Sequence, residues 1–506
     1  MSQTRNEVQL VAYADRLAGD IPGLAHVVRR DFAGWFGGVH VLPFFTPFDG
    51  ADAGFDPVDH TAVDPRLGTW DDIRGLSRTH DVIADIIVNH VSADSEQFRD
   101  VVEHGESSPS FPMFLTMSSV FPSGATEDDL TGIYRPRPGV PFTPMSIGGR
   151  TRYVWTTFTA NQIDIDVNSE PGRAYITSVL DAVAKAGVTL VRLDAIGYAV
   201  KTPGTSCFMT PASYDFIREL TALARARGVE VLVEVHSYVG HQIEIGSAVD
   251  RVYDFALPPL VLHAMYTGDG SALARWFEIR PSNAITVLDT HDGIGIIDVA
   301  PERPSNASTA PKPGLLDDRE VRELVAGIAD RCGGTHRVSS GGAESKDDIY
   351  QVNATYYDAL GRDDRRYLAA RAIQFFTPGI PQVYYVGALA GINDVELAAR
   401  SGVNRDINRH HYSTSEREAA LRQPVVQALG ALCRFRNQLP AFDGELDAKL
   451  EGPRLTMVRR GAAAPDVSAM CSVDLATGET RLSWSGHDFS GHTDDLLANP
   501  PRLPAS

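Results

Sequence analysis

Three carboxylic acids close short, largely apolar runs of this sequence. Asp194 closes the run 189–193, Glu234 closes 229–233, and Asp292 closes 285–291. Runs this short and rich in Val, Ile and Leu are typical of strands buried on both faces of a parallel sheet. An acid at the end of such a strand is expected at the mouth of a barrel or sheet, where active sites gather. Three acids in one pocket indicate chemistry on a sugar.

The residues around the acids predict separate roles for them. Arg192 lies two positions before Asp194, so on a strand both side chains point the same way, and Arg192 would keep an attacking carboxylate ionised. Apolar neighbours would raise the pKa of Glu234 and suit it to general acid catalysis. The alternatives are a structural ion pair for Asp194, a solvated strand end for Glu234 and an Asp-Gly turn for Asp292.

Loops supply further candidates. The run 85–90 ends in His90 after a strand-like stretch, and Asp52 lies in the loop-like stretch 52–56. Arginines stand in the Pro-stiffened segment 134–138 and in 404–409, and a stiff arginine suits an anion site. A structural histidine, a solvated turn and ordinary solvated arginines are the competing interpretations.

Charge and composition exclude several classes of protein. The 506 residues carry a formal net charge of −19, which argues against binding to nucleic acid or to anionic membrane surfaces. A phosphate-bearing substrate would therefore need local Arg or Lys. The four Cys are widely spaced, and phosphate-loop, dinucleotide-loop and HExxH motifs are absent, so we expect no cofactor and no metal. Without an apolar signal-peptide core near the N-terminus, a cytoplasmic location is expected.

The strands that must position these residues alternate with helical patterns. This α/β alternation favours a (β/α)₈ (TIM) barrel with two inserted loop domains over its C-terminal face and a small C-terminal β domain. The strand-like runs are 8–13, 38–43, 82–88, 190–194, 231–235, 252–257, 285–289 and 381–386. Predicted limits are 1–87, 170–293 and 362–441 for the barrel, 88–169 and 294–361 for the insertions, and 442–506 for the β domain.

Four of these segments follow the motif order of the α-amylase-type glycoside hydrolases. They are Asp85 to His90, Arg192 to Ala195, Glu234, and His291-Asp292. The chain further resembles the sucrose phosphorylase family within that group. The segments that carry this closer resemblance are 43–56, 132–139, 204–210, 382–387, 402–409 and 494–501.

The resemblance implies a retaining double displacement. Asp194 would attack the glucosyl carbon of sucrose, Glu234 would protonate the departing fructose, and Asp292 would hold the sugar. Inorganic phosphate would then release α-D-glucose 1-phosphate from a β-glucosyl-enzyme, and other acceptors would also be glucosylated. The implied small-molecule partners are thus sucrose, phosphate, fructose and glucose 1-phosphate, and a homodimer is left open.

The resemblance also assigns residues to the two ends of the pocket. Around the glucose it places Asp52, Phe55, His90, Phe158, Gln162, Arg192, His291 and Arg405. Around the acceptor it places Tyr134, Arg137, Asp348, Tyr350 and Gln351.

The sequence departs from the family pattern at Asp347, Ile349, Pro144 and Met145, which leaves the preferred acceptor open. The alternatives are a sibling phosphorylase acting on sucrose 6′-phosphate, glucosylglycerol or glucosylglycerate, a plain hydrolase or transglucosylase, and a non-catalytic sugar-binding protein.

Overall fold

Eight parallel strands close into a barrel in a computed structural model that describes residues 4–50, 52–136, 139–302, 312–340 and 349–503. Around the barrel the strand order is β1-β17-β13-β12-β11-β10-β5-β2. All eight predicted runs are confirmed as barrel strands. Their bounds are β1 Gln9–Ala12, β2 Gly38–Val41, β5 Asp81–Ile87, β10 Leu190–Asp194, β11 Glu230–Val233, β12 Arg251–Asp254, β13 Ala284–Thr286 and β17 Ile380–Tyr384.

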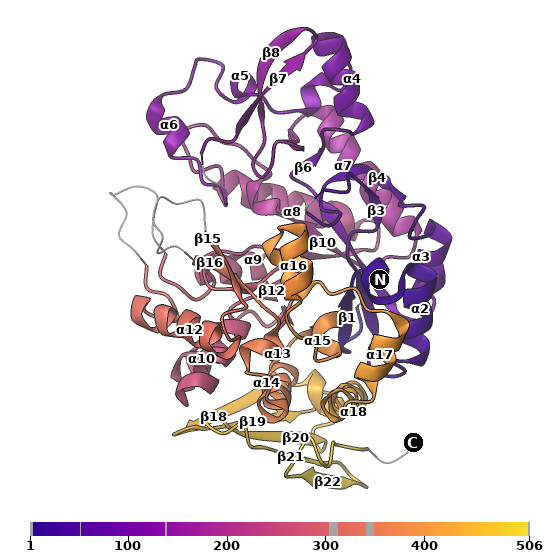
Figure 1. The fold of residues 1–506 in the computed structure, drawn as a ribbon, viewed down its shortest axis with the longest axis vertical. Coiled ribbons are helices and arrows are strands. Elements are labelled where there is room, and N and C mark those ends of the chain that lie inside the picture. Colours follow the sequence, from indigo (N-terminus) through magenta and orange to yellow (C-terminus); the bar gives the residue numbers. More distant parts are fainter. Residues whose placement is uncertain (1–3, 51, 137–138, 303–311, 341–348, 504–506) are drawn as a thin grey trace.

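Helices cover the outside of the barrel (Figure 1), and apolar side chains fill its interior. The inner cluster is formed by Ile83, Leu190, Leu232, Tyr253, Phe255, Ile285, Val287 and Ile380. Helices α7 (Glu170–Lys185) and α8 (Pro211–Arg225) lie before and after β10 in the chain. The other helices outside the two insertions are α1 Ala14–Ala18, α2 Ile21–Arg30, α3 Trp70–Ser77, α9 Val239–Gly246, α10 Leu257–Thr267, α11 Ser271–Ile279, α14 Asp364–Phe376, α15 Tyr385–Ala388, α16 Val395–Ser401, α17 Thr414–Leu421 and α18 Pro424–Gln438.

Two long segments interrupt the alternation where they were expected, although the exact limits of the domains stay predictions. In Figure 1 the first lies at the opposite end of the molecule from the C-terminal sheet. It follows β5 and contains β6 His90–Ser92, α4 Glu96–His104, α5 Met117–Val120, α6 Glu127–Thr131, β7 Phe142–Ile147, β8 Arg150–Trp155 and β9 Gln162–Asp164. The hairpin of β3 (Phe45–Pro47) and β4 (Pro57–Val63) comes earlier in the chain, before α3 and β5. The second long segment contains β14 Ile294–Gly295, α12 Asp318–Arg331, β15 Arg337–Ser340, β16 Ile349–Asn353 and α13 Tyr356–Ala359.

The chain ends in an antiparallel sheet of five strands, which covers α14 and α18. Its strands are β18 Leu446–Glu451, β19 Arg454–Arg460, β20 Ser468–Asp474, β21 Thr480–Ser485 and β22 Ser490–Thr493. Alternate residues of β19 to β21 are buried, and Trp484 packs on Phe435 of α18 with ring centroids 5.1 Å apart. Among the described residues, none of the helices has both the length and the apolar character needed to cross a membrane.

A buried lysine joins the first insertion to the barrel. The Lys201 ammonium lies 2.7 Å from Asp164 Oδ2 and donates to Asn89 Oδ1 at 2.8 Å and to the Tyr198 carbonyl. Asn89 follows barrel strand β5, and Asp164 ends β9. Three oxygens thus converge on one ammonium, which supplies positive charge to the junction.

Replacing this lysine should destabilise the whole fold. In Lys201→Met the Asp164 carboxylate keeps its burial and loses its cation, which typically costs about 3–5 kcal/mol. The free energy of unfolding from urea titrations of intrinsic fluorescence would measure the loss. Lys185→Met, on an exposed lysine of α7, is the matched control; equal stabilities for the two variants would contradict the assigned role.

Candidate active site

A cavity of about 560 Å³ opens at the C-terminal ends of the barrel strands. Asp194 ends β10, Glu234 directly follows β11, and Asp292 lies in the loop after β13, six residues beyond the end of that strand. All three predicted catalytic acids line the cavity. Its wall also contains Asp52, Phe55, His90, Phe158, Tyr198, Phe208, His236, His291, Tyr350, Gln351, Asn404 and Arg405.

One guanidinium holds two of the acids together. Arg192 is buried, and its Nη1 lies 3.0 Å from Asp194 Oδ1 while its Nη2 lies 2.9 Å from Glu234 Oε1. The same Nη1 also contacts Asp85. The Oδ2 of Asp85 lies 3.0 Å from His40 Nε2. Arg192 does not line the cavity itself. It lies behind the cavity wall and orients the carboxyl groups of Asp194 and Glu234.

Arg192 is shared among the carboxylates of Asp85, Asp194 and Glu234. Burial, followed by the charge of Glu234, raises the pKa of Asp194 well above its ordinary value, and Arg192 offsets only part of that. A nearby carboxylate disfavours the charged form of its neighbour, so the ionisation of Asp194 is coupled to the charge of Glu234.

The chain turns sharply after Asp194. Ala195 has φ 54°, a left-handed conformation that non-glycine residues rarely adopt. Its N–H points to Glu234 Oε2 at 3.4 Å. The turn leads into a short 3₁₀ segment, Ile196–Tyr198, and Tyr198 becomes part of the cavity wall.

Two arginines stabilise the third acid. Asp292 Oδ1 lies 3.0 Å from Arg405 Nη1 and 3.6 Å from Arg409 Nη2, and Asn408 donates to the Asp292 carbonyl at 2.6 Å. Burial would raise the pKa of Asp292, but Arg405, His291 and Arg409 together lower it far below its ordinary value. Asp292 therefore stays a carboxylate and can accept hydrogen bonds from sugar hydroxyl groups.

The predicted glucose residues meet at one end of the cavity. Gln162 donates to Asp52 Oδ2 at 2.7 Å, and His90 Nε2 donates to the Phe55 carbonyl at 2.9 Å. The Phe55 ring stacks on His291 with centroids 4.8 Å apart. Gln162 is buried behind the wall, so it positions Asp52 and does not face the cavity.

The predicted acceptor residues are only partly brought together. Tyr350 and Gln351 line the cavity, whereas Tyr134 lies behind the wall and packs on Phe208 with ring centroids 4.8 Å apart. Arg137, Asp347 and Asp348 lie outside the described residues. Ile349 begins β16. Pro144 and Met145 belong to β7 and are not among the residues that line the cavity.

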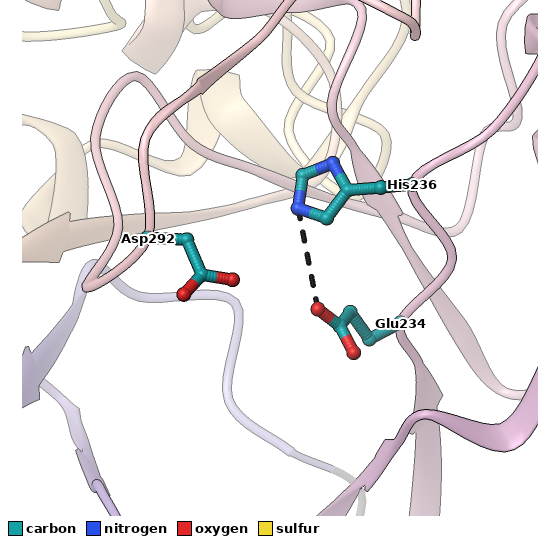
Figure 2. A group of neighbouring side chains, drawn as sticks. All are labelled: Glu234, His236 and Asp292. Carbon is teal, nitrogen blue, oxygen red and sulfur yellow. Dashed lines mark ion pairs between the residues drawn. The ribbon is translucent and has the colours of Figure 1, made fainter. Parts of the chain in front are cut away.

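Several cavity residues were missed from the sequence. His236 lies two positions after Glu234, a spacing that could have indicated it. Figure 2 shows it beside Glu234 and Asp292, with Nε2 4.0 Å from Glu234 Oε1. Tyr198 and Phe208 carried no comparable signal. Donor atoms of the three labelled residues lie within 4.8 Å of one another, but Arg192 and Arg405 already pair with the two carboxylates, and their charge disfavours a divalent cation.

Comparison with known proteins identifies the group to which this cavity belongs. Residues 35–242 match the family model described as "Alpha amylase, catalytic domain". The chain is 52% identical over 504 residues to the sucrose phosphorylase of Bifidobacterium adolescentis, covering 98% of this chain and 99% of that one. It is 57% identical over 445 residues to the sucrose phosphorylase of Agrobacterium vitis, covering 88% and 90%.

A solved structure agrees with these relatives. The sucrose 6F-phosphate phosphorylase from Thermoanaerobacter thermosaccharolyticum superposes with a TM-score of 0.89 at 36% identity, covering 97% of this chain and 98% of that one. The chain belongs to the sucrose phosphorylase family of α-amylase-type enzymes.

Proposed function

We propose that this protein catalyses the reversible phosphorolysis of sucrose to α-D-glucose 1-phosphate and D-fructose. The observation that carries the proposal is the bridge from Arg192 to both Asp194 and Glu234, at 3.0 and 2.9 Å. Binding to one guanidinium limits the separation of the two carboxyl groups, which favours the spacing of about 5–5.5 Å used by retaining enzymes over the wider inverting one. The identity to sucrose phosphorylases supports sucrose as the donor.

In the first step the glucosyl unit moves from fructose to the protein. Asp194 attacks the anomeric carbon while Glu234 donates its proton to the glycosidic oxygen, so fructose leaves with that proton and a β-glucosyl ester forms. Asp292 holds sugar hydroxyls and strengthens this contact as positive charge develops on the ring. Its two arginines keep it ionised for that purpose.

In the second step phosphate takes the place of fructose. A phosphate oxygen attacks the anomeric carbon, the ester bond to Asp194 breaks, and Glu234 accepts the proton of a protonated acceptor. Two inversions give net retention, Asp194 is released as a carboxylate, and Glu234 has regained its proton. Other hydroxyl compounds that enter the acceptor end would be glucosylated by the same route.

The positions of the residues in and behind the cavity wall support the remaining site assignments. Asp52, Phe55, His90, Phe158, His291 and Arg405 surround the glucose, and Gln162 and Arg192 hold their neighbours in place. Tyr350 and Gln351 contact the acceptor, with Tyr134 supporting that wall. For Arg137 and Asp348 the acceptor role is carried by family resemblance.

One assay tests the proposal. Purified protein incubated with sucrose and inorganic phosphate should release fructose and glucose 1-phosphate in equal amounts. Glucose in place of glucose 1-phosphate would indicate a hydrolase. Faster turnover of sucrose 6′-phosphate, or faster reverse reaction with glycerol or glycerate than with fructose, would assign the chain to a sibling phosphorylase. A cytoplasmic location and a homodimer stay predictions, and light scattering would test the homodimer.

A further inference from the structure

A buried carboxylate lies directly behind His236. Asp298 is fully buried, and its Oδ2 lies 2.9 Å from His236 Nδ1. Its Oδ1 accepts from Gln242 Nε2 at 2.9 Å and from the Ser237 N–H at 3.3 Å. A carboxylate only accepts, so Nδ1 carries the hydrogen and the ring directs Nε2 into the cavity.

The backbone around Gly295 allows His236 and Asp298 to approach each other, and it is hydrogen-bonded to the strand at the acceptor end of the cavity. A Cβ on Gly295 would lie 2.0 Å from Asp298 Oδ2 and 3.2 Å from His236 Nδ1, so the close approach requires glycine at that position. The N–H groups of Ile296 and Ile297 both donate to the Tyr350 carbonyl, at 3.0 and 3.3 Å. The segment that carries Asp298 therefore also fixes the strand bearing Tyr350 and Gln351.

In the described part of the chain, the charged groups nearest to His236 are acids. They are Glu234 at 4.0 Å, Asp292 within 4.8 Å and Asp298 at 2.9 Å. The ring stacks on Phe255 at 3.8 Å and meets Tyr350 edge-on at 5.8 Å. Among the described residues of the wall, the other strong cation, Arg405, is engaged by Asp292 and, at 3.7 Å, by Asp52. Of the cationic groups in the described part of the wall, His236 therefore lies nearest to Glu234.

We propose that Asp298 is a positioning residue that keeps His236 oriented and protonated, so that its Nε2–H binds the anionic second substrate beside Glu234. The proposal rests on the phosphorolysis proposed above and deepens it, because it names the charge that a phosphate meets in a chain of net charge −19. Fructose, which is neutral, gains only a hydrogen bond from the same group.

The direction of the His236 pKa agrees with this geometry. Burial lowers the pKa of the imidazole, but the Asp298 carboxylate, with smaller contributions from Glu234 and Asp292, more than offsets burial, and the net direction is upward. A raised pKa keeps the ring protonated to higher pH. Phosphate-dependent turnover should therefore fall as pH rises through the His236 pKa, and loss of Asp298 should move that fall to lower pH.

The test is Asp298→Asn, which keeps the shape and removes the charge. We expect the KM for phosphate to rise about tenfold, as for loss of one charge-assisted hydrogen bond, and sucrose hydrolysis without phosphate to fall less than about threefold. In the rate–pH profile of phosphorolysis, the alkaline limb should shift to lower pH. In the rate–pH profile of hydrolysis, the alkaline limb should not move. An unchanged phosphate KM, or a parallel loss of both reactions, would overturn the proposal.

Two further measurements keep the test independent of folding and of the proposed function. Asp358→Asn, on another buried aspartate that pairs with Arg362 away from the cavity, is the matched control and should leave the ratio of the two reactions unchanged. NMR titration of the wild-type histidines, with His236→Gln for assignment, should show that phosphate raises the His236 pKa; no change would count against the proposal. Wild-type protein that makes no glucose 1-phosphate would instead refute the function.

Discussion

Asp194→Ala should abolish turnover of sucrose, with a loss of about four to six orders of magnitude, because no other group can form the glucosyl ester. Of the three acids, only Asp194 is itself the last residue of a barrel strand and contacts Arg192 Nη1. Initial rates of glucose 1-phosphate formation, measured with enough enzyme to detect very slow turnover, give the size of the loss.

The fold should survive this substitution. Removing Asp194 relieves repulsion between two buried carboxyl groups, and Arg192 keeps Asp85 and Glu234 as partners. Thermal melting checks this directly. The matched control is Asp181→Ala, on a largely exposed aspartate of α7 that pairs with Arg227, where activity should be unchanged. Retention of more than a few per cent of wild-type activity by Asp194→Ala would refute its role as nucleophile.

A covalent experiment identifies the nucleophile without a variant. A 2-fluoro glucosyl fluoride slows both steps by destabilising the charged transition state, and its good leaving group favours build-up of the glucosyl-enzyme. Mass spectrometry of a digest should then find the added glucosyl mass on the peptide that contains Asp194. Labelling of a peptide with Glu234 or Asp292 would reassign the roles.

The barrel could be predicted because its strands are fully buried and short. Runs such as 82–88 are apolar enough to mark a strand without any tertiary information. The two outer strands of the C-terminal sheet could not be predicted in this way. Strand β22, Ser490–Thr493, contains no apolar side chain. Strand β18 alternates charged residues with Leu and Ala, and these apolar residues are only half-buried. Pairing with β19 and β21 makes them strands, and pairing is not visible in the local sequence.

The acids could be predicted from strand ends, but their electrostatics could not. The spacing of Arg192 and Asp194 indicated one ion pair, and only the closed barrel brings Asp85 and Glu234 to the same guanidinium. Asp298 lies 62 residues from His236 in the sequence, and nothing in either segment marks them as partners. Tyr198 likewise reaches the wall through the sharp turn after Asp194, and Phe208 through the loop before α8, and the course of both depends on tertiary packing.

Glu234→Gln should produce a loss that depends on the leaving group. With sucrose, which needs a proton on the departing oxygen, we expect turnover to fall by about 10²–10⁴-fold, the usual contribution of general acid–base catalysis. With α-glucosyl fluoride as donor and phosphate as acceptor the loss should be far smaller, since fluoride leaves without help and phosphate is already an anion. An equal loss with both donors would mean that Glu234 acts only through structure.

The same variant also tests the effect of the Glu234 charge on the ionisation of Asp194. Glutamine keeps an oxygen for Arg192 but removes the charge that, after burial, does most to raise the pKa of Asp194. The pKa of Asp194 should therefore fall, and because Asp194 attacks only when ionised, reaction with α-glucosyl fluoride should persist to lower pH than in the wild type. Rate–pH profiles of both proteins measure this. An acid limb that does not move would contradict the effect of the Glu234 charge on Asp194.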